Sequence, residues 1–146
     1  MELAAVLAII GILAAVAIPR FVDSTGFSSR GVYDQAQGLI ASARRIAVAQ
    51  RQSSPKTPIH VDISAARIRV CRDAACTVLV ADPAGGAPLV LDAPPGVTFG
   101  PAITFSFDGS GAPSFGAPLA VTVNSTGVGD INRTFFVEAR SGYVHD

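Results

Sequence analysis

The 146-residue sequence is poor in charged residues and in metal-ligating side chains. Charged residues make up 15% of it, below the usual quarter, and the formal net charge is zero, so overall charge indicates no polyanionic partner. The two histidines, His60 and His145, lie far apart, and only two cysteines accompany them, so a four-ligand zinc site is not expected. The sequence contains neither a Gly-x-x-x-x-Gly-Lys-Ser/Thr loop nor a nucleophile-elbow pattern. We therefore predict no enzymatic activity, no cofactor and no bound metal.

The few charges are unevenly distributed along the chain. Residues 20–56 contain six basic and two acidic residues, whereas residues 57–146 contain five basic and eight acidic ones. Such an asymmetry either steers contacts between subunits or reflects an ordinary solvated helix face, and the sequence leaves both interpretations open.

One strongly apolar segment runs from Leu3 to Ile18 and contains no polar side chain in 16 residues. As a helix it would be about 24 Å long, whereas a bilayer core is about 30 Å thick and needs roughly 20 helical residues. The run is therefore slightly too short to cross the core alone. A cleaved signal peptide is the main alternative. However, no basic stretch precedes the run, no small-x-small site ends it, and a helical pattern continues after Pro19. We predict a membrane-inserting and filament-forming helix over residues 1–24.

Three residues of this segment are unfavourable in an apolar helix. Glu2 places a carboxylate at the edge of the run, Gly11 weakens the helix by about 1 kcal/mol relative to alanine, and Pro19 cannot donate a backbone hydrogen bond. Spacing alone places Glu2 either at the membrane surface or against a positive charge of a neighbouring subunit. Pro19 predicts a kink or a locally melted stretch.

The segment from Met1 to Phe21, with Glu2, Gly11 and Pro19 at these spacings, resembles the mature N-terminus of type IV pilins and type II secretion pseudopilins. The resemblance implies that Glu2 pairs with the N-terminal amine of a neighbouring subunit, and that Gly11 and Pro19 mark where the helix melts during assembly. It also implies a subunit that resides in the bacterial inner membrane before a pilus assembly machinery joins it to other pilin subunits in a periplasmic or extracellular filament. We expect the basic leader and the methylated N-terminus of the family to lie outside this numbering.

After Pro19, apolar residues recur at spacings of three and four, which predicts an amphipathic helix over residues 25–54. Such a helix packs one side on a domain and leaves the other side to water or to a neighbour. Pro55 and Pro58 end the pattern. The predicted apolar stripe consists of Tyr33, Ala36, Leu39, Ile40, Ala43, Ile46, Ala47 and Ala49.

Residues 55–146 are predicted to form an antiparallel β-rich head, because segments of β-forming residues alternate with turns rich in Gly, Pro and Asp. Together with the preceding helix they predict an α+β domain, in which a long N-terminal helix, kinked near Pro19, packs on an antiparallel sheet. The pilin resemblance implies the same fold. The predicted strands are 59–63, 67–70, 77–80, 89–91, 103–107, 119–123, 134–137 and a short last strand at 143–144.

Two candidate sites lie near one predicted hairpin of the head. Cys71 and Cys76 flank a tight connection, which predicts a disulfide formed in an oxidising compartment. Arg67, Arg69 and Arg72 form a candidate nucleic-acid patch. We expect binding to nucleic acid to be weak or absent, because residues 57–146 carry a formal charge of −3 and end in an acidic tail.

Looser motifs at residues 30–35, 47–51, 105–111 and 140–145 resemble minor pilins of the mannose-sensitive haemagglutinin type, in the GspH/FimT-like group. The resemblance implies a minor pilin that helps to initiate or cap a filament. A type II secretion pseudopilin and a pilus subunit that captures DNA for uptake are the alternatives. Some FimT-like proteins bind DNA through a basic C-terminal tail, whereas residues 141–146 of this chain lack paired arginines.

Overall fold

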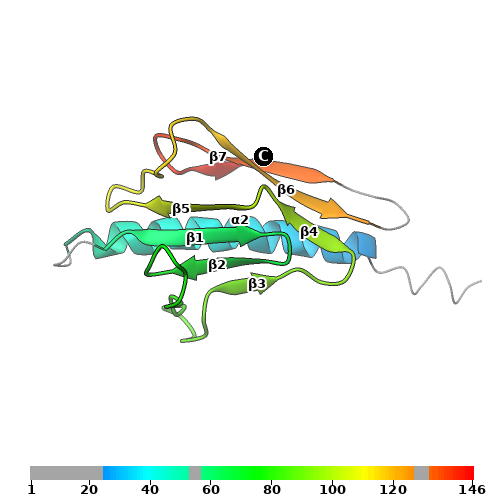
Figure 1. Ribbon diagram of the computed structural model, residues 1–146, viewed down its shortest axis with the longest axis horizontal. Coiled ribbons are helices and arrows are strands. Elements are labelled where there is room, and N and C mark those ends of the chain that lie inside the picture. The colour runs from blue at the N-terminus through cyan, green and yellow to red at the C-terminus, as the bar shows by residue number, and fades with distance from the viewer. Residues whose placement is uncertain (1–24, 53–56, 127–131) are drawn as a thin grey trace, which may run out of the picture.

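The computed structural model describes residues 25–52, 57–126 and 132–146, with side chains described from Ser29 onward. A single long helix, α2 (Thr25–Ala49), continues into a 3₁₀ turn, η1 (Gln50–Gln52), and lies along antiparallel strands (Figure 1). This arrangement confirms the predicted α+β class, a helix packed on an antiparallel β-head. The predicted kink near Pro19 lies outside the described residues.

Within the described residues the strands form two four-stranded antiparallel sheets. Sheet 1 has the order β3-β2-β1-β5, and sheet 2 has the order β4-β6-β7-β8. Figure 1 shows both sheets on the same side of α2. The strands are β1 (Ile59–Ser64), β2 (Arg67–Cys71), β3 (Val90–Asp92), β4 (Val97–Gly100), β5 (Ile103–Phe107), β6 (Leu119–Ser125), β7 (Arg133–Val137) and β8 (Val144–His145).

The chain passes from sheet 2 to sheet 1 between β4 and β5. β4 pairs with β6 and β5 pairs with β1, although only Pro101 and Ala102 separate the two strands. Pro101 has no N–H to donate, which interrupts a strand ladder. A Cβ at Gly100 would lie 3.0 Å from Thr122 Oγ1, which is closer than most Cβ atoms approach a neighbour. The sequence predicts no strand at residues 97–100, so β4 and the division into two sheets emerge only from the structure.

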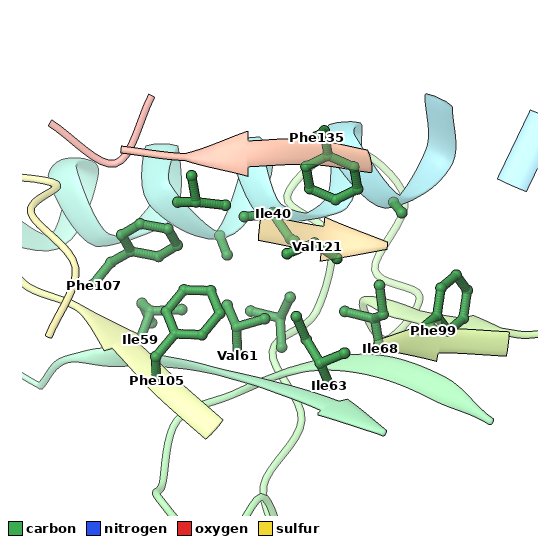
Figure 2. Packing of buried hydrophobic residues seen from close by; sticks show 14 of the residues in the cluster. Ile40, Ile59, Val61, Ile63, Ile68, Phe99, Phe105, Phe107, Val121 and Phe135 are labelled. Carbon is green, nitrogen blue, oxygen red and sulfur yellow. The ribbon is translucent and has the colours of Figure 1, made fainter. Parts of the chain in front are cut away.

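The hydrophobic core lies between α2 and the inner faces of both sheets (Figure 2). In β1 the buried residues Ile59, Val61 and Ile63 alternate with half-buried polar ones, as expected for a strand with one covered face. Sheet 2 contributes Val121 and Phe135, both fully buried. The core therefore joins strands from both sheets to one helix.

The predicted apolar stripe of α2 is largely confirmed. Ala36, Ile40 and Ala43 are completely buried, and Val32 joins them in the core although it was not part of the prediction. Ala49 is exposed, so the prediction was wrong at that position. Ala49 is the last residue of α2, and the 3₁₀ turn η1 begins at the next residue.

The predicted strand at residues 77–80 is wrong. In its place the chain forms only isolated bridges, between Cys71 and Leu79 and between Ala81 and Pro88. Val78 and Leu79 are exposed there, whereas Val80 is buried. A β-forming composition therefore produced no regular ladder in this segment, because β3 takes the position beside β2.

Candidate functional site

The residues predicted to direct assembly, Glu2, Gly11 and Pro19, lie outside the described part of the chain, as does the whole predicted membrane segment. None of the helices that the structure describes is long and apolar enough to cross a membrane. The structure does describe the cysteine pair, the three candidate nucleic-acid arginines and the face of α2 that points away from the sheets.

The two cysteines form a disulfide, as their spacing predicted, with Cα atoms 5.1 Å apart. Cys71 is the last residue of β2, and Cys76 has a positive φ of 55° that turns the chain back. The returning segment lies beside the end of β2, where Val80 N donates to Val70 O at 2.9 Å and Arg72 N donates to Val78 O at 2.8 Å. The disulfide therefore closes a compact loop at one end of sheet 1.

Asp73 organises the interior of this loop. Its carboxylate accepts hydrogen bonds from Thr77 N at 3.0 Å, Thr77 Oγ1 at 2.8 Å and Val78 N at 2.8 Å. These hydrogen bonds, that of Thr77 N above all, lower the pKa of Asp73 to about 2. The sequence does not predict this role of Asp73, beyond the general tendency of aspartate side chains to accept hydrogen bonds from nearby backbone N–H groups.

Carboxylates neutralise two of the three candidate nucleic-acid arginines. Arg69 donates through Nη2 and Nε to Asp62 Oδ2, at 2.6 and 3.1 Å, and Thr104 Oγ1 donates to Asp62 Oδ1 at 2.9 Å. Arg67 Nε lies 3.3 Å from Asp92 Oδ1. Both pairs join residues in direct cross-strand register. The charge that these two arginines offer to a polyanion is therefore largely compensated.

The arginines of α2 lie on the other side of sheet 1 from Arg67 and Arg69. Arg67 and Arg69 alternate along β2 with the buried residues Ile68 and Val70, so their side chains leave the sheet on the face opposite the core. The helix arginines, Arg44 among them, lie across the sheet on α2. Folding therefore separates the basic residues of the helix from those of β2, and Arg72 is exposed at the disulfide loop.

Side-chain hydrogen bonds that the sequence does not predict connect the C-terminal residues to α2. Asp146 Oδ1 accepts from Tyr33 Oη and from Gln37 Nε2, each at 2.6 Å. Burial, reinforced by the Asp146 carboxylate, raises the pKa of Tyr33 to about 12. The Tyr33 hydrogen bond lowers the pKa of Asp146. Arg44 Nε also donates to Ser141 O at 2.6 Å, so α2 holds the loop before β8 as well.

Three rings stack on the outer face of sheet 2. The His145 ring lies between Phe136 and Tyr143, with centroid distances of 5.9 and 5.7 Å. His145 Nε2 lies 2.9 Å from Glu138 Oε1, and this hydrogen bond raises the pKa of His145. The Tyr143 side chain is among the most exposed large hydrophobic groups, at 61%. The arrangement stabilises a short edge strand and presents no paired nucleophile and base.

A surface hollow of 490 Å³ lies beside the C-terminal end of α2 and is bordered by Arg51, Asp108 and Ser110. No group of three or more His, Cys, Asp or Glu side chains that could hold a metal ion occurs among residues 25–52, 57–126 and 132–146.

Comparison with known proteins finds a partial match to a type IV pilin. Over 54 residues the chain is 44% identical to the type IV narrow pilus major component PilA5 of Thermus thermophilus. This alignment covers 37% of the chain and 47% of the relative, so the chain spans about half the length of the curated protein that it matches. The chain is thus a partial homologue of a type IV pilin. No family model matches the chain, and no solved structure matches it.

Proposed function

We propose that this chain is a structural subunit of a type IV pilus-like filament, in which it polymerises through its N-terminal apolar helix. The partial homology to a type IV pilin supports this most directly. A single amphipathic helix that covers two sheets and directly follows an apolar segment with Glu2, Gly11 and Pro19 is consistent with it. The other pilin subunits, the inner membrane before assembly and the assembly machinery are the partners that this function requires.

Within that class we favour a minor pilin of the mannose-sensitive haemagglutinin type, on the motifs at residues 30–35 and 105–111. A type II secretion pseudopilin remains the nearest alternative, since it shares the helix and the head architecture. Deletion of the encoding gene distinguishes the two. Loss of surface filaments with intact protein secretion supports the pilus, and the reverse result supports the pseudopilin.

A pilus subunit that captures DNA is the second alternative. The charges of β2 and of the C-terminal tail argue against this function. Arg67 and Arg69 are paired with carboxylates, and Asp146 makes the C-terminal tail acidic. Because phosphate neutralisation dominates affinity for DNA, we expect weak or no binding at about 0.15 M salt. Micromolar binding in a gel shift, abolished by Arg67→Ala/Arg69→Ala, would place DNA capture first.

The decisive experiment for the filament concerns Glu2. Glu2→Ala should leave the full chain in the membrane and reduce its incorporation into filaments, because a carboxylate in an apolar segment needs a partner charge. Immunoblots of sheared filaments and of membranes measure the two pools. Incorporation of Glu2→Ala at the wild-type level would contradict the proposed pairing, and absence of the wild-type chain from filaments would contradict the function itself.

A further inference from the structure

The side of α2 that faces away from the sheets forms a continuous strip, which we call the exposed ridge. Its members recur at intervals of three or four residues and so share one side of the helix. All are exposed except Ser42, which is half-buried. The exposed ridge consists of Gly31, Asp34, Gly38, Ser42, Arg45 and Ala49.

The exposed ridge carries one acidic and one basic side chain without a charged partner. Among the described residues Asp34 and Arg45 take part in no ion pair, and Arg45 Nη2 donates only to Ser42 Oγ at 2.9 Å. They are 11 residues apart, or about 16 Å along a helix that rises about 1.5 Å per residue. They therefore cannot pair with each other within one copy.

The same spacing of 11 residues relates the small residues of the exposed ridge. Ser42 follows Gly31 by 11 positions, and Ala49 follows Gly38 by 11 positions. A Cβ built at Gly31 or at Gly38 would meet no atom within 4 Å, so the surface is open there to another backbone. Eleven residues are close to three whole helical turns, so a displacement of this length keeps the same side of the helix in contact.

We propose that the exposed ridge binds the exposed ridge of a second copy of this chain, parallel to it and displaced by 11 residues, so that Arg45 of one copy pairs with Asp34 of the next. The displacement also sets Ser42 against Gly31 and Ala49 against Gly38, which allows a close helix–helix approach. This inference rests on the proposed filament function, in the form in which neighbouring subunits are copies of this chain rather than a single subunit at the tip. It adds to that function the contact between α2 helices and its axial step of about 16 Å.

Two features of the surface favour this contact. Hollows of 370 and 330 Å³ flank Arg45, one bordered by residues 82–84 and the other by residues 142–144, so side chains of a neighbour have room beside the helix.

The contact joins Arg45 of one copy to Asp34 of the next, so each copy keeps one of its two charges available for a third copy. Such a heterologous contact propagates into an open helical assembly. An antiparallel pair would join the same charges but would close as a dimer.

Cysteine cross-linking in filaments of the full chain tests the geometry. The double variant Asp34→Cys/Arg45→Cys should give a ladder of covalent dimers, trimers and larger species from sheared filaments, which a reductant removes. The two introduced thiols of one copy are too far apart to react with each other, because a disulfide needs Cα atoms within about 7 Å. The native cysteines are already paired with each other. Arg30→Cys/Ala41→Cys, with the same spacing beside the exposed ridge, is the matched control and should give no ladder.

Charge variants decide the case if the cysteine variant fails to assemble. Asp34→Arg and Arg45→Asp should each lower incorporation into filaments several-fold, and the double exchange Asp34→Arg/Arg45→Asp should restore it. Arg72→Asp, which makes the same change of charge away from the exposed ridge, should have no effect. Dimers without larger species, filaments that contain the double cysteine variant without cross-links, or wild-type incorporation of both single charge variants would each overturn the inference. Absence of the wild-type chain from filaments would instead refute the proposed function.

Discussion

Sheet 1 and sheet 2 pack on the same helix, but different interactions complete them. On the outer face of sheet 1, Asp62 and Arg69 pair across neighbouring strands, and Arg67 pairs with Asp92 in the same way. On sheet 2 the edge strand β8 has only two residues, and Tyr33 and Gln37 of α2 hold the aspartate that follows it. Cross-strand ion pairs therefore complete sheet 1, whereas the edge of sheet 2 also depends on hydrogen bonds from the distant helix α2.

The largest expected effect tests whether sheet 2 belongs fully to the shared core. Phe135 is completely buried in β7, and its ring packs edge-to-face on that of Tyr33, with the ring centroids 5.6 Å apart. Phe135→Ala should lower the free energy of unfolding by about 3–5 kcal/mol. The neighbouring Phe136 is 37% exposed, so Phe136→Ala should cost less than about 1 kcal/mol. Urea denaturation of residues 25–146 measures both values.

That fragment should be a soluble, cooperatively folded monomer, because α2 supplies its own apolar face to both sheets. An aggregated or molten fragment would contradict this expectation. Equal costs for the two phenylalanine variants would show that sheet 2 is not packed against α2 as described.

The next effect concerns the turn that leads into β8. Gly142 has a φ of 63°, and a Cβ there would collide with the carbonyl oxygen of Gly111 and lie 2.7 Å from the Phe107 ring. Gly142→Ala should therefore lower the free energy of unfolding by at least about 2 kcal/mol, from the left-handed backbone and the overlap together. Gly116→Ala is the matched control, since a Cβ there meets nothing within 4 Å. A thermal melt in which the two variants behave alike would contradict the described turn.

The same contrast explains what the sequence could predict. Alternation along β1 and the three-to-four spacing along α2 are local signals, because one covered face imposes a period on the residues that meet it. The cysteine spacing is local too. By contrast, the hydrogen bond from Tyr33 to Asp146 spans 113 positions, and no local pattern records such a contact. The opposing charges of Asp62 and Arg69 are visible in the sequence, but their pairing depends on a strand register that only the fold supplies.

The predictions failed where tertiary context overrode local preference. Residues 77–80 have a strand-like composition, yet β3 pairs with β2 and leaves them only isolated bridges. No strand is predicted at residues 97–100, which lie between Pro95 and Pro101, yet β6 pairs with them.

Removal of the disulfide should affect sheet 1 selectively. Cys71→Ser/Cys76→Ser should lower the free energy of unfolding by about 2 kcal/mol, on the chain-entropy estimate for so short a loop. Hydrogen exchange should lose protection around the end of β2 and keep it in β6 and β7, because the backbone hydrogen bonds beside the loop are made with the end of β2. Mass spectrometry of non-reduced protein first establishes the bond in periplasmic material. Two free thiols there, or a uniform loss of protection in both sheets, would contradict the prediction.

The smallest effect is a dependence on pH that separates the edge of sheet 2 from sheet 1. The hydrogen bond to Glu138 raises the pKa of His145 above 6.5, so its contribution is complete below that pH and disappears as the pH rises through the folded-state pKa. The hydrogen bonds from Tyr33 and Gln37 lower the pKa of Asp146 below 3.8, so its contribution is complete above that value and disappears in stronger acid. Both contributions are therefore present together between pH 3.8 and 6.5.

Loss of stability in acid does not identify sheet 2, because the pKa of Asp73 in the disulfide loop is also lowered, to about 2. The decline above pH 6.5 is the specific mark, since His145 ion-pairs with Glu138 at the edge of sheet 2. Thermal midpoints of residues 25–146 across about pH 3 to 9 should show a shallow decline on the alkaline side that His145→Gln removes. Asp146→Asn should weaken the acid dependence and only slightly reduce the alkaline decline, because the Asp146 charge is a lesser cause of the raised pKa of His145 than the hydrogen bond to Glu138. An alkaline decline that persists unchanged in His145→Gln would mean that the His145–Glu138 pair does not stabilise the edge of sheet 2.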